Sequence, residues 1–322
     1  MINKVDKVKE GHPSISVALC TYNGEKYLRN QLDSILCQTY PADEIVITDD
    51  CSTDGTLEII KEYAEKTAII KYSVNERNLG YVQNFSRAIS KTSCDFVALS
   101  DQDDIWTENH LELLLTHIED NAICVADAMM VDETGKELGI KFSEIKQNDY
   151  IPAGNIPKVY RIVYNYNPYQ GASMLINRKW VEGFLPFPPG TSFHDTFLAG
   201  CACLTKGLAV IPDVINRYRM HKGQVSTTWK VTVFDEIRRK RHHICFPNKQ
   251  VMIDFVLKTV PSLSPEATDF INEFKHILML DHMGRKKRIE ILRIMNRHYK
   301  EIHSCPTYKY IILRSLHFLL AF

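Results

Sequence analysis

Short apolar runs alternate with segments of helical periodicity over about the first 130 residues, and this order restricts the possible folds more than any other feature. The apolar runs have the length and composition of buried strands: residues 15–19, 44–48, 69–74 and 96–99. The segments between them, such as residues 27–36, repeat Leu and Ile at helical spacing. This alternation predicts an α/β fold with a mostly parallel sheet and helices on both faces.

Polar clusters follow three of the predicted strands at the points where the strands end. They are Thr21-Tyr22-Asn23, Asp49-Asp50 and Asp101-Gln102-Asp103-Asp104. Sheets of this kind bind ligands beyond the C-terminal ends of their strands. The three clusters are therefore predicted to meet at one site, although they lie far apart along the chain.

The third cluster places three carboxylates within four positions, directly after the apolar run 96–99. Carboxylates this close repel one another, which is tolerable in water or around a cation. In an extended segment alternate side chains share a face, so Asp101 and Asp103 are expected to point the same way. Oxygen ligands of this kind suit Mg²⁺ or Mn²⁺ together with substrate phosphates. A solvated acidic loop is the competing interpretation.

The other two clusters admit similar pairs of interpretations. Tyr22 could pack on a base or ribose, or lie in a plain turn. Asp50 could accept a hydrogen bond from a pyrimidine N3–H or a ribose hydroxyl. Asp54 and Thr56, further along the second cluster, are expected to cap the helix that follows.

Composition narrows the possible partners. The chain has 322 residues, 45% hydrophobic and 24% charged, enough for one large domain or two small ones. Because the net charge is zero, the protein has no overall positive field that would attract a nucleic acid. None of the nine cysteines forms a Cys-x-x-Cys pair, so buried reduced thiols are expected, as in a reducing cytosol. The first 14 residues lack the apolar core of a signal peptide, and no run reaches the roughly 20 apolar residues of a membrane span.

Four motifs in register resemble the catalytic domain of family 2 glycosyltransferases, which have the GT-A fold. They are residues 17–24, residues 47–56, Asn78-Leu79-Gly80 with Asn84, and residues 99–106. The resemblance covers Ile15 to Leu111 firmly and extends more loosely to about residue 225. One departure is Cys51, where glycine is frequent in the family; because cysteine is small, little consequence is expected.

The resemblance implies inverting transfer of a sugar from a nucleotide-diphosphate donor, with Mn²⁺ or Mg²⁺ as cofactor. Five residues would bind the nucleotide sugar: Thr21, Tyr22, Asp50, Asn78 and Asp101. Three would hold the metal: Asp101, Asp103 and His221. For Arg219, near His221, contact with the diphosphate and structural support remain equal alternatives.

The same resemblance implies the acceptor side of the site. Inversion requires a general base for the acceptor hydroxyl. The stretch His194-Asp195-Thr196 matches the family's second acidic motif, so Asp195 is expected to be that base, a role compatible with capping a helix. His194 and Trp106 are expected to contact the acceptor.

The chain is divided on this basis into a catalytic domain, residues 1–225, and a basic helical region, residues 226–322. A nucleotide half would span about 14–130 and an acceptor half about 131–225, with a long excursion or lid over residues 132–168 and two short strands over 208–211 and 214–219. Residues 282–322 hold nine Lys or Arg and two Glu. The segments 230–241 and 285–300 and the apolar end 310–322 predict either contact with an anionic membrane or packing on the catalytic domain.

The implied function is a step in bacterial surface polysaccharide synthesis on the cytoplasmic side, at the inner face of the plasma membrane, with a saccharide or lipid-linked acceptor. The stretch Ser100–Trp106 with His194–Ala199 is similar to rhamnosyltransferase-like members, which implies L-rhamnose from dTDP-rhamnose. The absence of a Gln-x-x-Arg-Trp motif argues against a processive synthase. Two alternatives stay open. A sugar-nucleotide pyrophosphorylase would need a Gly-rich phosphate loop, which residues 21–24 do not resemble. A non-catalytic sugar-nucleotide binding module is disfavoured because Asp103 and Asp195 are both present.

Overall fold

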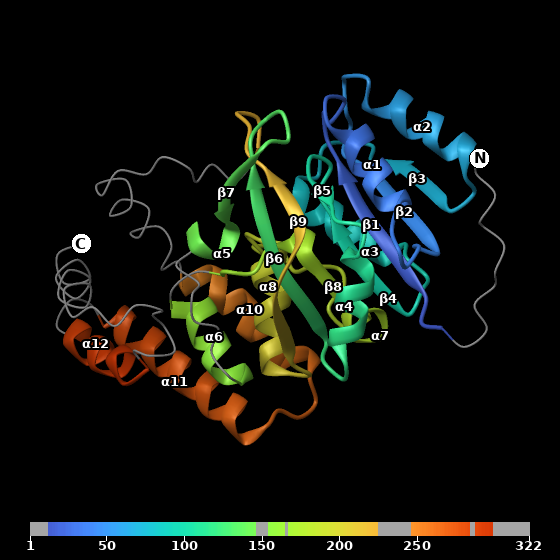
Figure 1. Cartoon of the computed structure of the whole chain (residues 1–322). Helices are drawn as coiled ribbons and strands as arrows, with labels where there is room; N and C mark the ends of the chain where they lie inside the picture. Colours follow the sequence, from blue (N-terminus) through green and yellow to red (C-terminus); the bar gives the residue numbers. More distant parts are fainter. Residues whose placement is uncertain (1–11, 146–153, 165–166, 225–245, 284–286, 299–322) are drawn as a thin grey trace.

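The computed structural model describes residues 12–145, 154–164, 167–224, 246–283 and 287–298 (Figure 1). Its centre is one nine-stranded sheet with the strand order β3-β2-β1-β4-β8-β6-β9-β5, and β7 pairs with β6. Helices cover both faces of this sheet (Figure 1).

The N-terminal half of the sheet is parallel, as the alternating sequence predicts. Its strands are β1 (Ile15–Thr21), β2 (Glu44–Asp49), β3 (Ile70–Val74) and β4 (Phe96–Ser100). The connecting helices are α1 (Leu28–Leu36), α2 (Thr56–Lys66) and α3 (Tyr81–Ser90). Every residue of β1 and β2 is buried, because helices cover the central strands on both faces.

The other half of the sheet is mixed. It contains β5 (Ile105–Trp106), β6 (Ile123–Val131), β7 (Glu137–Lys141), β8 (Met174–Asn177) and β9 (Leu208–Arg219). β8 runs antiparallel to β4 and β6, whereas β9 runs parallel to β6. Instead of the two expected strands over 208–219 there is one, whose register shifts against β6 near Asp127. Such a bulge bends a strand without ending its pairing.

The expected excursion over residues 132–168 contains regular structure in its described part. β7 continues from β6 as a hairpin, and α5 (Phe142–Ile145) and α6 (Asn155–Tyr164) follow. Val159, Ile162 and Val163 of α6 are buried beside α8 (His194–Leu204). Polar and proline-rich composition therefore concealed a helix that is stabilised by tertiary packing rather than by local signals.

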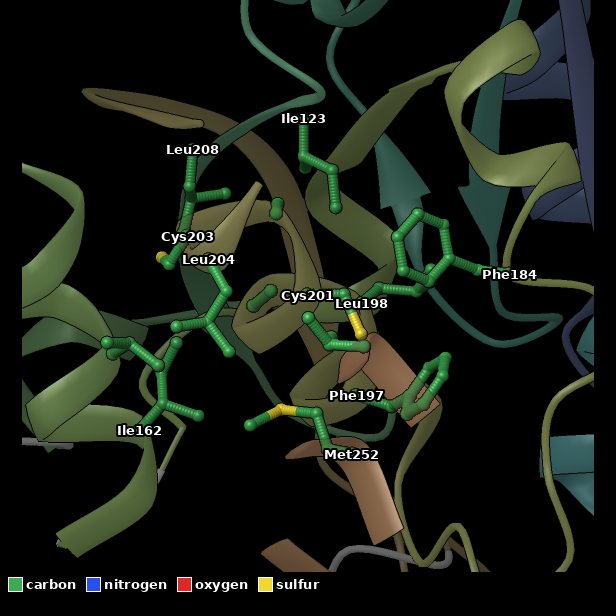
Figure 2. Packing of buried hydrophobic residues seen from close by; sticks show 14 of the residues in the cluster. Ile123, Ile162, Phe184, Phe197, Leu198, Cys201, Cys203, Leu204, Leu208 and Met252 are labelled. Carbon is green, nitrogen blue, oxygen red and sulfur yellow. The ribbon is translucent and has the colours of Figure 1, made fainter. Parts of the chain in front are cut away.

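Two hydrophobic clusters lie on opposite sides of the sheet. The smaller packs α1, α2 and α4 (His110–Ile118) on one face. The larger surrounds α8, where Phe197, Leu198 and Cys201 meet Ile162 of α6 and Met252 (Figure 2). The described cysteines are free: four are buried, as expected, whereas Cys51 and Cys94 are half-buried and Cys37 is exposed.

The C-terminal helices share the larger cluster. They are α10 (Phe246–Thr259), α11 (Pro265–His282) and α12 (Arg288–Arg297), and α10 and α11 lie beside α8 and α6 (Figure 1). Met252, Phe270 and Ile291 are buried there, so the C-terminal helices pack against the part of the chain that contains α6 and α8. The segments 230–241 and 310–322, and Arg285 with Lys286, lie outside the described residues. No described helix is long and apolar enough to cross a bilayer.

Candidate active site

The loops after β1, β2 and β4 meet at the C-terminal ends of these strands, as predicted. The backbone N–H of Asp50 donates to the carbonyl of Thr21 at 2.9 Å. The side chain of Gln102 bonds the backbone of Tyr22 from the third loop. Parallel pairing causes this convergence, because β1 lies between β2 and β4 and all three end on the same side.

The three carboxylates of the acidic loop have different neighbours. Asp104 is fully buried and accepts hydrogen bonds from Asn216 Nδ2 at 2.8 Å and from the Arg219 N–H at 3.1 Å. Burial and repulsion from Asp103 and Asp101 raise the pKa of Asp104 well above its usual range. Asp104 therefore anchors the acidic loop to β9.

Asp101 lies among other acids. Burial raises its pKa to about 7, and repulsion from Asp103 and Asp195 adds to the effect. A cation beside these groups would relieve this repulsion and favour the ionised form.

Asp103 is bonded to His221 rather than free. His221 Nε2 lies 2.7 Å from Asp103 Oδ2, and its ring lies 4.9 Å from that of Tyr27. The Gly223 N–H donates to His221 Nδ1 at 3.2 Å, so in the neutral ring Nε2 carries the proton and donates to the carboxylate. His221 would have to exchange this bond for a metal bond to act as a ligand.

The donor set fits a cation of the Mg²⁺ type. In the described part of the chain no three His, Cys, Asp or Glu side chains form a ready-made cage. Mg²⁺ is commonly held by one or two carboxylates, with phosphates and water completing its octahedron. The close, repelling pair Asp101 and Asp103 matches this requirement.

On the nucleotide side, Asp50 binds the loop between β3 and α3. Its carboxylate accepts from Asn75 Nδ2 at 2.7 Å, the Leu79 N–H at 2.8 Å and the Gly80 N–H at 2.9 Å. A carboxylate offers about four acceptor positions, so one remains for a ligand. Asp50, only 2% exposed, thus holds in place the loop that presents the exposed Asn78.

Two other residues of this region have structural partners. Thr21 is 1% exposed and its hydroxyl donates to Asp49 Oδ1 at 2.8 Å, so the expected contact with the nucleotide sugar is at odds with the structure. Its neighbour Tyr22 is 48% exposed. Asp54 accepts the N–H of Thr56 at 3.1 Å, as a capping side chain does, whereas Gly55 occupies the cap position expected for Thr56.

Cys51 departs from expectation for a reason that side-chain size does not reveal. Its φ is +66°, in the left-handed region that disfavours every residue with a Cβ. Its thiol donates to the carbonyl of Asn75 at 2.8 Å. Glycine fits this position because of the backbone angle, so the small size of cysteine does not remove the cost of its Cβ.

Asp195 lies in the first turn of α8, across from the acidic loop. Burial raises the pKa of Tyr81 to about 12, with further contributions from Asp195 and Asp101. The starts of α3 and α8 and the acidic loop therefore lie close together. The Asp195 carboxylate accepts from the Thr196 N–H, which leaves acceptor capacity on its second oxygen.

The structure contradicts the expected acceptor contacts of Trp106 and His194. Trp106 is 3% exposed and stacks on His110, with ring centroids 3.8 Å apart. His194 is 7% exposed and stacks on Phe85 at 4.1 Å, and burial lowers its pKa. Each residue follows or precedes a polar site residue, but the strand or helix turns its ring into the core.

For Arg219 the structure favours one of the two alternatives that the sequence left open. Its guanidinium is almost fully buried and donates to the carbonyls of Asp103 at 2.8 Å and Glu133 at 3.0 Å. It also lies over the Tyr27 ring, 4.7 Å from the centroid. These contacts favour structural support of the acidic loop over contact with a diphosphate.

Comparisons with known proteins agree with this architecture. A family model described as glycosyl transferase family 2 matches residues 16–182, more than half of the chain. An uncharacterized glycosyltransferase of Haemophilus influenzae is 26% identical over 96% of this chain and 91% of its own length. The putative teichuronic acid biosynthesis glycosyltransferase TuaG of Bacillus subtilis is 35% identical over 31% of this chain, which covers 40% of TuaG.

Two solved structures show the same fold at low identity. TarS residues 1–349 of S. aureus in complex with UDP-GlcNAc matches with a TM-score of 0.54 and 18% identity, over 90% of this chain and 88% of that one. The mannosyltransferase PcManGT of Pyrobaculum calidifontis, in complex with GDP-Man and Mn²⁺, matches with a TM-score of 0.55 and 17% identity, over 96% and 80%.

Proposed function

This chain belongs to glycosyltransferase family 2, and we propose that it transfers a sugar, with inversion, from a nucleotide-diphosphate donor to a saccharide or lipid-linked saccharide. The observation that carries the proposal is that Asp195, in the first turn of α8, lies close enough to Asp101, directly after β4, to raise the pKa of that carboxyl. Inverting transfer needs a carboxylate base for the acceptor beside the group that binds the donor.

On the donor side we assign Tyr22 and the loop bearing Asn78 to the nucleotide, with Asp50 holding that loop. Asp101 and Asp103 would hold Mn²⁺ or Mg²⁺ together with the diphosphate. When bound, the cation acts as a Lewis acid that stabilises the leaving diphosphate. Asp101 would also approach the donor sugar or ribose.

On the acceptor side Asp195 is proposed as the general base. It would take the proton of the acceptor hydroxyl while the hydroxyl oxygen bonds to the anomeric carbon and the bond to the diphosphate breaks. Asp195 suits this role because it lies near Asp101 and because its second oxygen has no hydrogen-bond donor among the described residues.

The first test is a donor screen. Purified protein with Mn²⁺ is offered dTDP-rhamnose, UDP-glucose, UDP-galactose, UDP-N-acetylglucosamine and GDP-mannose with an acceptor extract, and nucleotide diphosphate release is measured. We propose dTDP-rhamnose as the donor, and surface polysaccharide as the product class, which the name of TuaG supports. No release from any donor would refute the proposal. Formation of a nucleoside triphosphate from pyrophosphate would instead indicate a pyrophosphorylase, which the family membership disfavours.

The second test is Asp195→Asn. Loss of a general base is expected to lower kcat about a thousandfold while nucleotide binding changes little. Asp254→Asn on the exposed side of α10 is the matched control and should leave kcat unchanged. Transfer by Asp195→Asn at near the wild-type rate would show that another group is the base.

We also propose peripheral contact with the cytoplasmic face of the plasma membrane. Met279 of α11, Met283 directly after α11 and Ile289 of α12 are each more than half exposed, and Lys287 lies nearby in sequence. Apolar side chains beside basic ones suit an anionic lipid surface. The full chain should sediment with phosphatidylglycerol vesicles and not with phosphatidylcholine vesicles, and Met279→Ser with Met283→Ser should weaken this binding.

A further inference from the structure

Gln102 stands between the two carboxylates of the proposed metal site but points elsewhere. Its amide pairs with the backbone of Tyr22 in both directions. Gln102 Oε1 accepts from the Tyr22 N–H at 2.8 Å, and Gln102 Nε2 donates to the Tyr22 carbonyl at 2.9 Å. Two opposed bonds from one rigid amide restrain both the distance and the orientation of the groups they join.

This pair lies where the sheet no longer connects the two loops. The parallel pairing of β1 with β4 ends at Leu19 and Ser100. Beyond that point β4 has ended and β1 pairs only with β2, as far as Thr21 and Asp49. The Gln102 side chain therefore connects β1 to the acidic loop where the backbone pairing between β1 and β4 has stopped. It joins Tyr22, on the nucleotide side, to the segment carrying Asp101 and Asp103.

The turn after β1 is shaped to admit this amide. A Cβ built on Gly24 would lie 2.2 Å from Gln102 Oε1 and 2.5 Å from its Cδ. Any larger residue at position 24 would therefore displace the amide from Tyr22. Because the clashing atoms are the end of a flexible side chain, the chain can fold with alanine there and lose only the contact.

The amide joins the acidic loop to Tyr22 through hydrogen bonds alone. Nothing in the Gln102 side chain adds charge, so it restrains the loop without competing for a cation.

We propose that Gln102 is a positioning residue that sets the distance between Tyr22 and the carboxylates Asp101 and Asp103, and so aligns the nucleotide with its diphosphate. This proposal rests on the proposed function and adds a residue that touches neither the donor nor the reacting atoms. Small misplacements of a bound reactant can cost about a hundredfold in rate.

The test is a double-mutant cycle of Gln102→Ala and Gly24→Ala. Each single variant should lower kcat/KM for the donor about thirtyfold and weaken Mn²⁺-dependent binding of UDP, dTDP or GDP, whichever the wild type binds. The double variant should be no worse than either single one, because both remove the same contact. KM for the acceptor should stay within about twofold. Gly183→Ala, whose Cβ would meet its nearest atom at 3.7 Å, is the matched control.

The outcomes separate this proposal from the proposed function. If the wild type transfers sugar but both single variants keep the donor kcat/KM, Gln102 does not position the donor and the proposed function stands. Additive losses would mean that the two residues act separately, which also overturns the proposal. If the wild type transfers no sugar, the proposed function fails, and the nucleotide-diphosphate affinities of the four proteins still decide whether Gln102 aligns this site.

Discussion

The Cys51→Gly variant should be more stable than the Cys51→Ala variant, although alanine is closer to cysteine in size. The residue has φ +66°, and its thiol donates to the carbonyl of Asn75 at 2.8 Å. Both substitutions lose that bond, worth about 1 kcal/mol. Alanine keeps the cost of a Cβ in the left-handed region, about 1–2 kcal/mol, whereas glycine does not.

Glycine in turn stabilises the unfolded chain by about 0.4–1 kcal/mol, because it increases the conformational entropy of that chain. We therefore expect the free energy of unfolding of Cys51→Gly to exceed that of Cys51→Ala by about 1 kcal/mol and to lie close to that of the wild type. Urea denaturation followed by circular dichroism measures the difference.

Cys37 provides a control in which the sign should reverse. It is exposed, it follows α1, and its φ is −94°, which any residue adopts. There alanine should be the more stable variant, by about 0.5–1 kcal/mol. If alanine were as stable as glycine at position 51, or if both positions gave the same sign, the explanation from the backbone angle would be refuted.

Three further predictions concern other parts of the molecule. Asp101→Asn should stabilise the chelator-treated protein: because the folded-state pKa, about 7, lies above the ordinary 3.8, ionised Asp101 costs stability progressively as pH rises between these values. The gain in urea midpoint should be large at pH 8 and small at pH 4.5, and a gain independent of pH would contradict this cause. Trp106→Phe should lower the free energy of unfolding by about 1–2 kcal/mol and leave the acceptor KM unchanged, since the indole packs on His110 in the core; a tenfold rise in that KM would restore its expected acceptor role. Gly200→Ala should lower the free energy of unfolding by about 1–3 kcal/mol, because its Cβ would lie 2.1 Å from Met252 Sδ. In a thermal melt, Gly200→Ala should lower the melting temperature less in a Met252→Ala background than in the wild type.

Local patterns in the chain were sufficient for much of the fold. The four parallel strands and their helices follow from apolar runs and helical spacing, and the meeting of three loops follows from parallel pairing. The helix over Asn155–Tyr164 was missed because its buried face is matched by α8, which is distant in sequence.

The site shows the same division. Residue types at strand ends identified Tyr22, Asp50, Asp101 and Asp103 as candidates, because ligands bind beyond the C-terminal ends of parallel strands. No pattern within the chain indicated that Trp106 and His194 turn into the core, since the direction of a ring depends on what packs against its strand or helix.

By itself the sequence determined the order of the strands and helices over about the first 130 residues, the family, and the loops that form the site, because periodicity and motif spacing are properties of neighbouring residues. Only the tertiary structure decided which side chains of those loops face a ligand, which support the loop, and how the loops are joined. Asp104 and Asp101 are three positions apart, yet Asp104 accepts from Asn216 and Asp101 lies near Asp195; the amide of Gln102 bonds Tyr22, eighty residues away. Such contacts depend on packing between distant segments, which no local pattern encodes.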